Sequence, residues 1–453
     1  MRFHRLFFCV ILVLSVSPLL LAQPEPSPLH EQIPSIYIET INLLSGDAGR
    51  SRLDVTFRIP YDFFIFVKDT AASSEFPFVA NAEITLEILD SNKLSVAREL
   101  TAKEIGVFDP PTNILPNQFL EGVFSFNLKP GKYAIVFEVR DVQSDRKYFS
   151  NNKTVTLKEF SNDSLRISDI IFLDAQSLRT STDLIPLNLG GDVPFGKNFN
   201  SYFEVASHGS NNPLHVSYSI SKILPENRER NIILRDTLPS SAITNAKSLT
   251  VNKQDRKFTY HVTDDAPQKG KYSIWMAVRA DTMTQGSYEM EITAREGNNV
   301  EVVNRPFHIR WIDMPLSLRS LQTAVDALEY IATEDEMKQL RTANLRLQHE
   351  VFDAFWKKRD KTPETAFNEV MAEYYKRVDY AFIAFRTVRE QNGIKTERAK
   401  AYILYGPPTT IDRELSPAAA PKEIWTYKNL NKRLIFIDES RIGDYKLVMT
   451  EQL

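Results

Sequence analysis

The chain has 453 residues, enough for about three domains, and its 43% hydrophobic and 25% charged residues are typical of a globular protein. Its net charge of −3 gives no case for nucleic acid or an anionic membrane surface as a partner. The single cysteine, Cys9, lies in the first apolar run, so the rest of the chain has no disulfide, cysteine nucleophile or cysteine-ligated metal.

Residues 1–22 have the three parts of a cleavable signal peptide. A basic start precedes an apolar run from Leu6 to Leu14, and a small residue precedes a polar one at Ala22-Gln23. The alternative is an uncleaved anchor, since the apolar stretch is at the lower limit for spanning a bilayer. Pro18 and the small-to-polar junction favour cleavage. We therefore expect an exported protein, periplasmic or secreted, whose residues 23–34 form a Pro-rich linker.

Residues 35–160 and 164–313 predict two tandem β-sandwich domains of Ig-like type. In both stretches apolar and polar residues alternate, as in 53–59, 133–139 and 258–262, which places one strand face on a core and the other in water. Many short strands without helices between them favour sandwiches. The polar, turn-prone segment Phe160–Leu165 predicts the boundary.

An internal match supports a relation between the two stretches. Gly131–Arg140 aligns without gaps with Gly270–Arg279, and Gly, Lys, Tyr, Ile, Val and Arg recur at one constant offset. Chance is the alternative, because a turn followed by a strand can be spelled in few ways. The domain-sized spacing favours related sandwiches and excludes a solenoid.

Residues 314–453 predict a third domain of α+β type. Thr333-Glu334-Asp335-Glu336 is a capping box that should open one helix with buried positions through Phe355. Thr362-Pro363 predicts the start of a further helix, with Pro in its first turn. After Asn392-Gly393 the period returns to two, which predicts strands at 402–405, 424–427, 434–437 and 445–448.

Known catalytic patterns are mostly absent. Gly191–Asn198 nearly spells a phosphate-binding loop, but Asn198 stands where Ser or Thr is needed, so a β-turn is expected. Histidines are sparse, and only His208 and His215 could approach metal-ligand spacing. No Gly-x-Ser-x-Gly sequence is present. We expect no metal, no cofactor and no Ser-His chemistry, whereas catalysis by carboxylates alone stays open because their spacing in space is invisible in the sequence.

The C-terminal segment resembles the GWxTD domain family over roughly residues 352–448. The resemblance is carried by Phe355–Asp360, Thr362-Pro363, Asn368-Glu369, Glu373–Ala381, Tyr402–Pro408, Glu423–Tyr427, Phe436–Asp438 and Gly443–Tyr445. The naming motif is imperfect: Gly393–Arg398 keeps Gly, Thr and Arg, with Ile for Trp and Glu for Asp. The resemblance implies an exported bacterial protein with β-rich N-terminal regions, and it carries over no catalytic residue.

Two interpretations of this domain remain. In the first, its aromatic residues form a core, and Arg398 binds a carboxylate such as Glu423, Asp438 or Asp444. In the second, a ligand groove lies under the loop Ser416–Pro421. The candidate binding residues are Arg377, Thr396, Glu397, Arg398, Tyr405, Gly406, Glu423 and Asp444.

The preferred function is a non-catalytic binding or assembly protein of the bacterial cell envelope. Its partner would be an envelope protein or a glycan, with no nucleic acid and no membrane span after cleavage of the signal peptide. The alternative is an envelope hydrolase that cleaves glycans with paired carboxylates.

Overall fold

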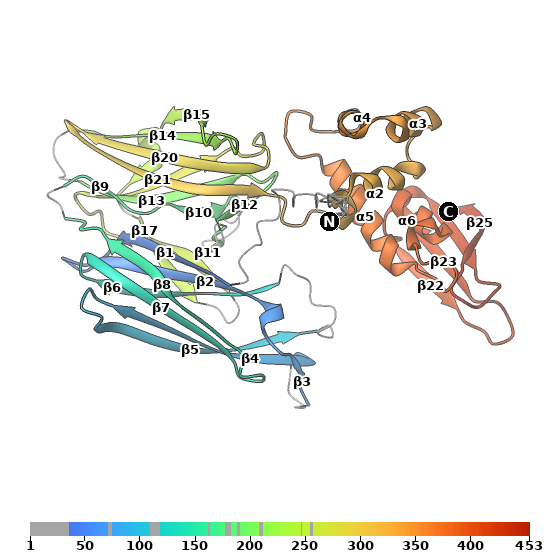
Figure 1. Ribbon diagram of the computed structural model, residues 1–453, viewed down its shortest axis with the longest axis horizontal. Helices are drawn as coiled ribbons and strands as arrows, with labels where there is room; N and C mark the ends of the chain where they lie inside the picture. The colour runs from blue at the N-terminus through green and yellow to red at the C-terminus, as the bar shows by residue number, and fades with distance from the viewer. Residues whose placement is uncertain are drawn as a thin grey trace, which may run out of the picture. The chain divides into compact units, whose positions relative to one another are not determined.

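The computed structural model describes residues 36–453 except 71–74, 109–117, 162–163, 177–182, 188–190, 208–211, 246 and 254–256. The predicted signal peptide, the Pro-rich linker, Cys9, His208 and the centre of the predicted boundary lie outside the described residues. Strands, paired mostly antiparallel, outnumber helices among the described residues, and every described α-helix lies beyond residue 320, as Figure 1 shows. This confirms a β-rich chain with a C-terminal α+β region. No described helix is both long and apolar enough to cross a bilayer.

The first group of strands, β1–β8, forms two sheets packed face to face. One has the order β1-β2-β6, and the other has the order β3-β4-β7-β8 with β5 on β4. Leu53, Val55 and Phe57 from one sheet meet Ile84, Leu86 and Phe137 from the other in one buried cluster. The strands are β1 (Tyr37–Leu44), β2 (Ser51–Pro60), β3 (Val67–Lys68), β4 (Phe78–Leu89), β5 (Ser95–Val107), β6 (Phe119–Leu128), β7 (Gly131–Asp141) and β8 (Lys147–Leu157).

The second group, β9–β21, has three sheets. Sheet β10-β13-β19-β16, with β9 on β13, packs on sheet β12-β21-β20-β14-β15, and β11-β18-β17 forms a small third sheet. The strands are β9 (Arg166–Ile167), β10 (Ile171–Asp174), β11 (Asp183–Leu184), β12 (Asp192–Pro194), β13 (Phe199–Ala206), β14 (Leu214–Ile223), β15 (Arg230–Thr237), β16 (Ile243–Thr244), β17 (Lys247–Lys253), β18 (Phe258–Asp264), β19 (Lys271–Val278), β20 (Gly286–Glu296) and β21 (Asn299–Arg310). The matched segments of the sequence become β7 and β19, each of which has a strand on both sides.

The near phosphate-loop sequence has a packing role. It contains β12 and then a turn in which Gly196 has φ +77°, as expected for a turn. A Cβ at Gly196 would lie 2.6 Å from Cβ of Phe367, so only glycine fits there. The ring of Phe367 meets Phe195 and Trp311 edge to face, with centroids 5.4 and 5.2 Å away. This contact joins the second strand group to the helical region.

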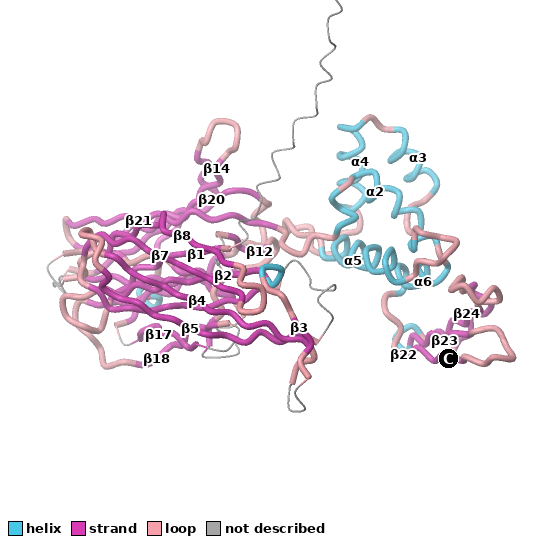
Figure 2. The backbone as a smooth tube through the Cα atoms, turned by 60° about the horizontal axis from the view of Figure 1, so that its bottom comes forward, coloured by secondary structure: helices cyan, strands magenta, loops and turns pink. Residues whose placement is uncertain are grey.

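The C-terminal region places helices beside a four-stranded antiparallel sheet, and the tube in Figure 2 shows α5 and α6 together. The helices are α2 (Leu321–Asp326), α3 (Glu334–Thr342), α4 (Leu345–Lys357), α5 (Glu369–Ala384) and α6 (Glu397–Tyr405). The 3-10 turns are η4 (Leu316–Arg319) before α2, η5 (Ala327–Tyr330) after it, η6 (Gly393–Lys395) between α5 and α6, and η7 (Lys428–Leu430) between β23 and β24. The strands are β22 (Thr410–Glu414), β23 (Lys422–Tyr427), β24 (Lys432–Ile437) and β25 (Lys446–Gln452). The capping box at Thr333 is present as predicted.

Two helix boundaries differ from the prediction because asparagine caps replace the expected starts. The single helix from Glu334 to Phe355 is wrong: Asn344 accepts a hydrogen bond from the backbone N–H of Leu347 and starts a separate helix. The helix expected at Thr362-Pro363 begins instead at Glu369, where Asn368 accepts from the N–H of Met371 at 2.8 Å.

The predicted strand at 402–405 is also wrong, because these residues end helix α6. The Thr396 hydroxyl accepts from the Ala399 N–H and starts the helix, and Gly406 at φ +79° stops it. Four consecutive apolar residues do not by themselves distinguish a strand from a buried helical turn.

Candidate functional site

Arg398 and Glu423 form a buried ion pair at the centre of the candidate residues. Nη1 of Arg398 lies 3.3 Å from the Glu423 carboxylate, and the two side chains are 12% and 6% exposed. Nη2 donates to the backbone oxygen of Gly443 at 3.0 Å, and the guanidinium lies 4.1 Å from the centroid of Tyr445. The structure therefore provides one of the three carboxylate partners proposed from the sequence.

Within the described residues, Glu423 accepts three hydrogen bonds. Besides Arg398, it accepts from Nε of Arg413 at 3.0 Å and from Nε1 of Trp425 at 3.1 Å. Arg413 lies directly across the β22–β23 pair from Glu423. The sequence analysis did not single out Arg413, although opposite charges on two short neighbouring strands were a usable signal.

Thr396, Glu397 and Asp444 also have internal partners. Besides capping α6, Thr396 Oγ1 donates to the Gly393 carbonyl at 2.9 Å. The Glu397 carboxylate accepts from the backbone N–H of Leu447 at 2.6 Å, which ties α6 to β25. Asp444 pairs with Lys446 at 3.1 Å. Thr396 and Glu397 thus position backbone segments around the Arg398–Glu423 pair.

Arg377, Tyr405 and Gly406 form a second set, at the other end of α6. Gly406 lets the Arg377 guanidinium lie across it, because a Cβ at position 406 would be 3.1 Å from the Arg377 Cζ. Arg377 donates to Glu373 at 2.7 Å, and Lys432 lies 4.5 Å from the Tyr405 ring. Lys432 was missed by the sequence analysis, since it comes close only through the turn before β24.

The structure does not bring all the groove residues proposed from the sequence together. In the described part of the chain no hydrogen bond or ion pair links the Arg398–Glu423 set to the Arg377–Tyr405 set. The loop expected to cover the groove is held by Arg441, which donates to the carbonyls of Pro417 and Ala419.

Asp438 is the other buried carboxylate of this region. Burial opposes its ionisation, but hydrogen bonds from the backbone N–H of Gly443 and from the Ser440 hydroxyl outweigh burial and hold the pKa of Asp438 below its ordinary value. It is therefore a stable anion that organises the turn before β25. Among the described residues no group of three or more His, Cys, Asp or Glu side chains could hold a metal.

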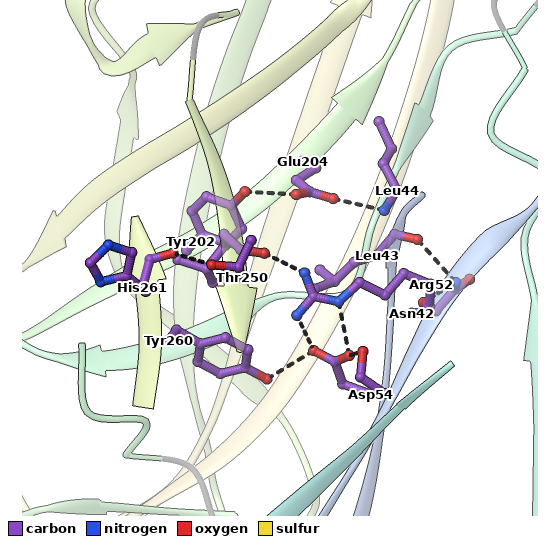
Figure 3. A network of polar contacts seen from close by, with 12 residues as sticks. Asn42, Leu43, Leu44, Arg52, Asp54, Tyr202, Glu204, Thr250, Tyr260 and His261 are labelled. Carbon is purple, nitrogen blue, oxygen red and sulfur yellow. Dashed lines mark hydrogen bonds and ion pairs between the residues drawn. The ribbon is translucent and has the colours of Figure 1, made fainter. Parts of the chain in front are cut away.

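A separate buried polar network joins the two strand groups (Figure 3). Arg52 donates to Asp54 through Nε and Nη2, at 2.9 and 2.6 Å, and to the carbonyl of Leu249 in the second group. Asp54 also accepts from the Tyr260 hydroxyl at 3.3 Å. An apolar cluster that includes Leu43 of β1 and Leu184 of β11 surrounds these contacts. The two strand groups therefore share a core.

Glu204 is a fully buried carboxyl in this network. It accepts from the Tyr202 hydroxyl and from the N–H of Leu44, both at 2.7 Å. Burial raises the pKa of Glu204, and these hydrogen bonds with the nearby Arg52 offset only part of the effect. Burial likewise raises the pKa of Glu39, although Arg305 of β21 forms an ion pair with it. These contacts hold the two strand groups together.

Comparison with known protein families identifies the C-terminal region. Residues 307–448 match the GWxTD domain. The chain carries a GWxTD domain. The match begins within β21 and ends within β25, so it includes the described α-helices and most of the four-stranded sheet. No curated protein sequence matches the chain.

Solved structures resemble the chain only weakly. The C-terminal domain of the Streptococcus agalactiae AgI/II polypeptide BspA is 12% identical, with 60% of this chain and 99% of that chain covered. BcpA, the major pilin subunit of Bacillus cereus, is 9% identical, with 51% of this chain and 68% of that chain covered. A family 123 glycoside hydrolase from Clostridium perfringens is 11% identical, with 44% of this chain and 36% of that chain covered. The TM-score is 0.16 in each case, so we base no argument on these likenesses.

Proposed function

We propose that this protein is an exported, non-catalytic binding or assembly protein of the bacterial cell envelope. Residues 35–160 and 164–313 would be two Ig-like sandwich domains that act as a spacer and docking unit. Residues 314–453, which contain most of the GWxTD domain, would be the recognition module. The signal-like N-terminus supports export.

The observation that carries this proposal is that the candidate carboxylates already have binding partners within the C-terminal region. Glu397, Glu423, Asp438 and Asp444 each bind a backbone N–H, a cation or a tryptophan within the same region. A glycan hydrolase needs a carboxylic acid with a raised pKa and a second carboxylate facing it across the substrate. Hydrogen bonds lower the pKa of Asp438, and Glu423 is occupied by three donors. This arrangement favours binding over hydrolysis.

The surface best suited to recognition is the second set of residues. Arg377 and Lys432 offer cationic donors, and Tyr402 and Tyr405 offer partly exposed rings at the end of α6. In the described part of the chain Lys432 has no carboxylate partner. Rings beside donors suit a sugar or a polar peptide segment.

Site-specific photo-crosslinking in intact cells would test this proposal. A crosslinking amino acid at Pro407, an exposed position next to Gly406, should trap a discrete partner. The same amino acid at Lys338, exposed on α3, serves as the matched control and should not. The protein recovered from the envelope should begin near Gln23.

Two results would contradict the proposal. Identical adducts from Pro407 and Lys338, or none from either, would remove the recognition surface. Release of soluble fragments from cell-wall glycan by the purified protein would instead support the hydrolase.

A further inference from the structure

The last turn of α5 leaves apolar side chains exposed where a helix in a folded core would bury them. Tyr380 is 51% exposed, Phe382 40% and Ile383 63%. At about 100° per residue, the side chains of Phe382, Ile383 and Tyr380 follow one another around the helix, and Arg386 comes just after its end. The buried residues Ala381 and Phe385 fill the opposite side.

A turn directly after the helix extends this surface. The Thr387 N–H donates to the Glu390 carbonyl at 3.0 Å, and the Glu390 N–H donates back to the Thr387 hydroxyl at 2.9 Å. Val388 and Arg389 therefore form the tip of a closed turn, and Val388 is 79% exposed. An apolar residue and a cation project together from this tip.

The turn that contains Gly393 lies against the same end of the helix. A Cβ at Gly393 would be 2.5 Å from the carbonyl oxygens of Ala381 and Phe382, so this contact requires glycine. Lys395, exposed at the end of η6, is thereby held near the helix end. We call Tyr380, Phe382, Ile383, Arg386, Val388, Arg389 and Lys395 the α5-end patch.

The patch is cationic although the whole chain is slightly acidic. Residues 376–400 contain seven Lys and Arg against three Asp and Glu. All three carboxylates bind backbone N–H groups: Asp379 at Ser317, Glu390 at Asn392 and Glu397 at Leu447. None of them neutralises a cation of the patch.

The cations of this segment divide into paired and unpaired ones. Lys376, Arg377 and Arg398 form ion pairs with Asp313, Glu373 and Glu423. Arg386, Arg389, Lys395 and, outside the patch, Lys400 have no ion pair within the described residues, and all four are exposed. The Arg386 guanidinium lies 4.4 Å from the centroid of the Phe382 ring, so charge and apolar surface are interleaved.

We propose that the α5-end patch docks the GWxTD domain on the surface of an anionic lipid bilayer. Exposed apolar side chains can enter the boundary between headgroups and acyl chains, while cations beside them meet lipid phosphates. Mobile lipid phosphates can pair with cations that have no carboxylate partner, including Arg386, whose Nε donates to the Phe382 carbonyl at 3.1 Å. This contact goes beyond the proposed function and uses residues other than its recognition surface.

Vesicle co-sedimentation tests this proposal with the chain that starts at Gln23, so that the apolar leader is absent. Vesicles of phosphatidylcholine alone are compared with vesicles that also contain phosphatidylglycerol. The protein should bind the anionic vesicles and lose that binding when salt rises from about 50 mM to about 500 mM. Arg386→Glu combined with Arg389→Glu should weaken binding by about 30-fold, since each cation near an anionic surface contributes roughly fivefold. Val388→Asp should weaken it by about 10-fold.

Matched controls lie elsewhere on the same region. Leu415→Asp changes an apolar side chain that is 69% exposed, and Lys338→Glu with Arg346→Glu reverses two exposed cations on α3 and α4. These variants should bind anionic vesicles within about threefold of the parent, because they lie outside the patch. Thermal melts of all variants should coincide, since only exposed side chains change.

Equal loss in the patch variants and the controls would overturn the proposal, as would equal binding to neutral and anionic vesicles. Absence of vesicle binding would also overturn the proposal. An acidic protein would then be the remaining candidate partner for the α5-end patch. None of these results would affect a crosslink at Pro407, which reports on the other surface.

Discussion

Replacement of Arg398 by alanine provides the sharpest test of how the GWxTD domain is held together. The change removes a charged hydrogen bond to Glu423, a second bond to the Gly443 carbonyl and the contact with the Tyr445 ring. Breaking a buried ion pair by removing one partner costs about 3–5 kcal/mol.

The structure places the expected cost at the low end of this range. Glu423 would retain its hydrogen bonds from Arg413 and Trp425, so its charge is not left alone. Nε of Arg398 is buried and has no hydrogen-bond partner among the described residues, so the native pair is imperfect. We therefore expect Arg398→Ala to lower the free energy of unfolding by about 3 kcal/mol, which corresponds to roughly 10 °C in a region of this size.

Arg413→Ala is the matched control, because Arg413 binds the same carboxylate from the surface. Its side chain is 62% exposed, and an exposed ion pair contributes about 1 kcal/mol or less. Calorimetric melts of the parent and both variants measure the difference. Equal costs, or an unchanged melt for Arg398→Ala, would refute the structural role of Arg398 and favour a role in ligand binding.

Two further predictions concern Glu204 and Gly393. Because burial raises the pKa of Glu204 in the folded protein, its ionisation lowers stability as pH rises through and above the ordinary carboxyl range. The melting temperature of Glu204→Gln should therefore be close to that of the parent near pH 4 and higher than that of the parent at pH 7. A parent protein with the higher melting temperature at pH 7 would contradict this. Gly393→Ala should cost about 1–3 kcal/mol, because the new Cβ would meet backbone oxygens of α5 at 2.5 Å. Gly46→Ala, with no atom within 4 Å of its Cβ, should change the melt by less than about 0.5 kcal/mol, and equal shifts would show that packing is not the cause.

Local patterns in the sequence predicted much of the fold. Alternation identified β2 and β7, the capping box at Thr333 opened α3, and the loss of alternation after Trp311 marked the change to helices. Each of these signals lies within about ten residues of the element that it predicts. Such local signals predict the folded structure correctly when tertiary packing favours the same element. The errors in α4, α5 and α6 arose where asparagine or threonine caps competed with other apparent starts.

Long-range placement was the part that sequence could not provide. Arg52 and Leu249 are 197 positions apart, and Glu204 and Leu44 are 160 apart, yet they meet in the network between the strand groups. Nothing in the alternation of β2 distinguishes a polar residue facing water from Asp54, which is fully buried beside Arg52. Partners of this kind depend on register and packing across sheets, which periodicity does not encode.

The degenerate motif itself shows why some positions tolerate change. Gly393 touches the backbone of α5 and cannot carry a side chain, and Thr396 starts α6 through its hydroxyl, so their chemistry is fixed. At Ile394, where the family name has Trp, the carbonyl rather than the side chain accepts a hydrogen bond from Tyr330, at 2.8 Å. At Glu397, where the name has Asp, any carboxylate long enough to reach the Leu447 N–H can serve. The motif thus differs at Ile394 and Glu397, where a backbone carbonyl or any sufficiently long carboxylate makes the hydrogen bond. It is unchanged at Gly393 and Thr396, where a side chain would not fit or a helix cap is required.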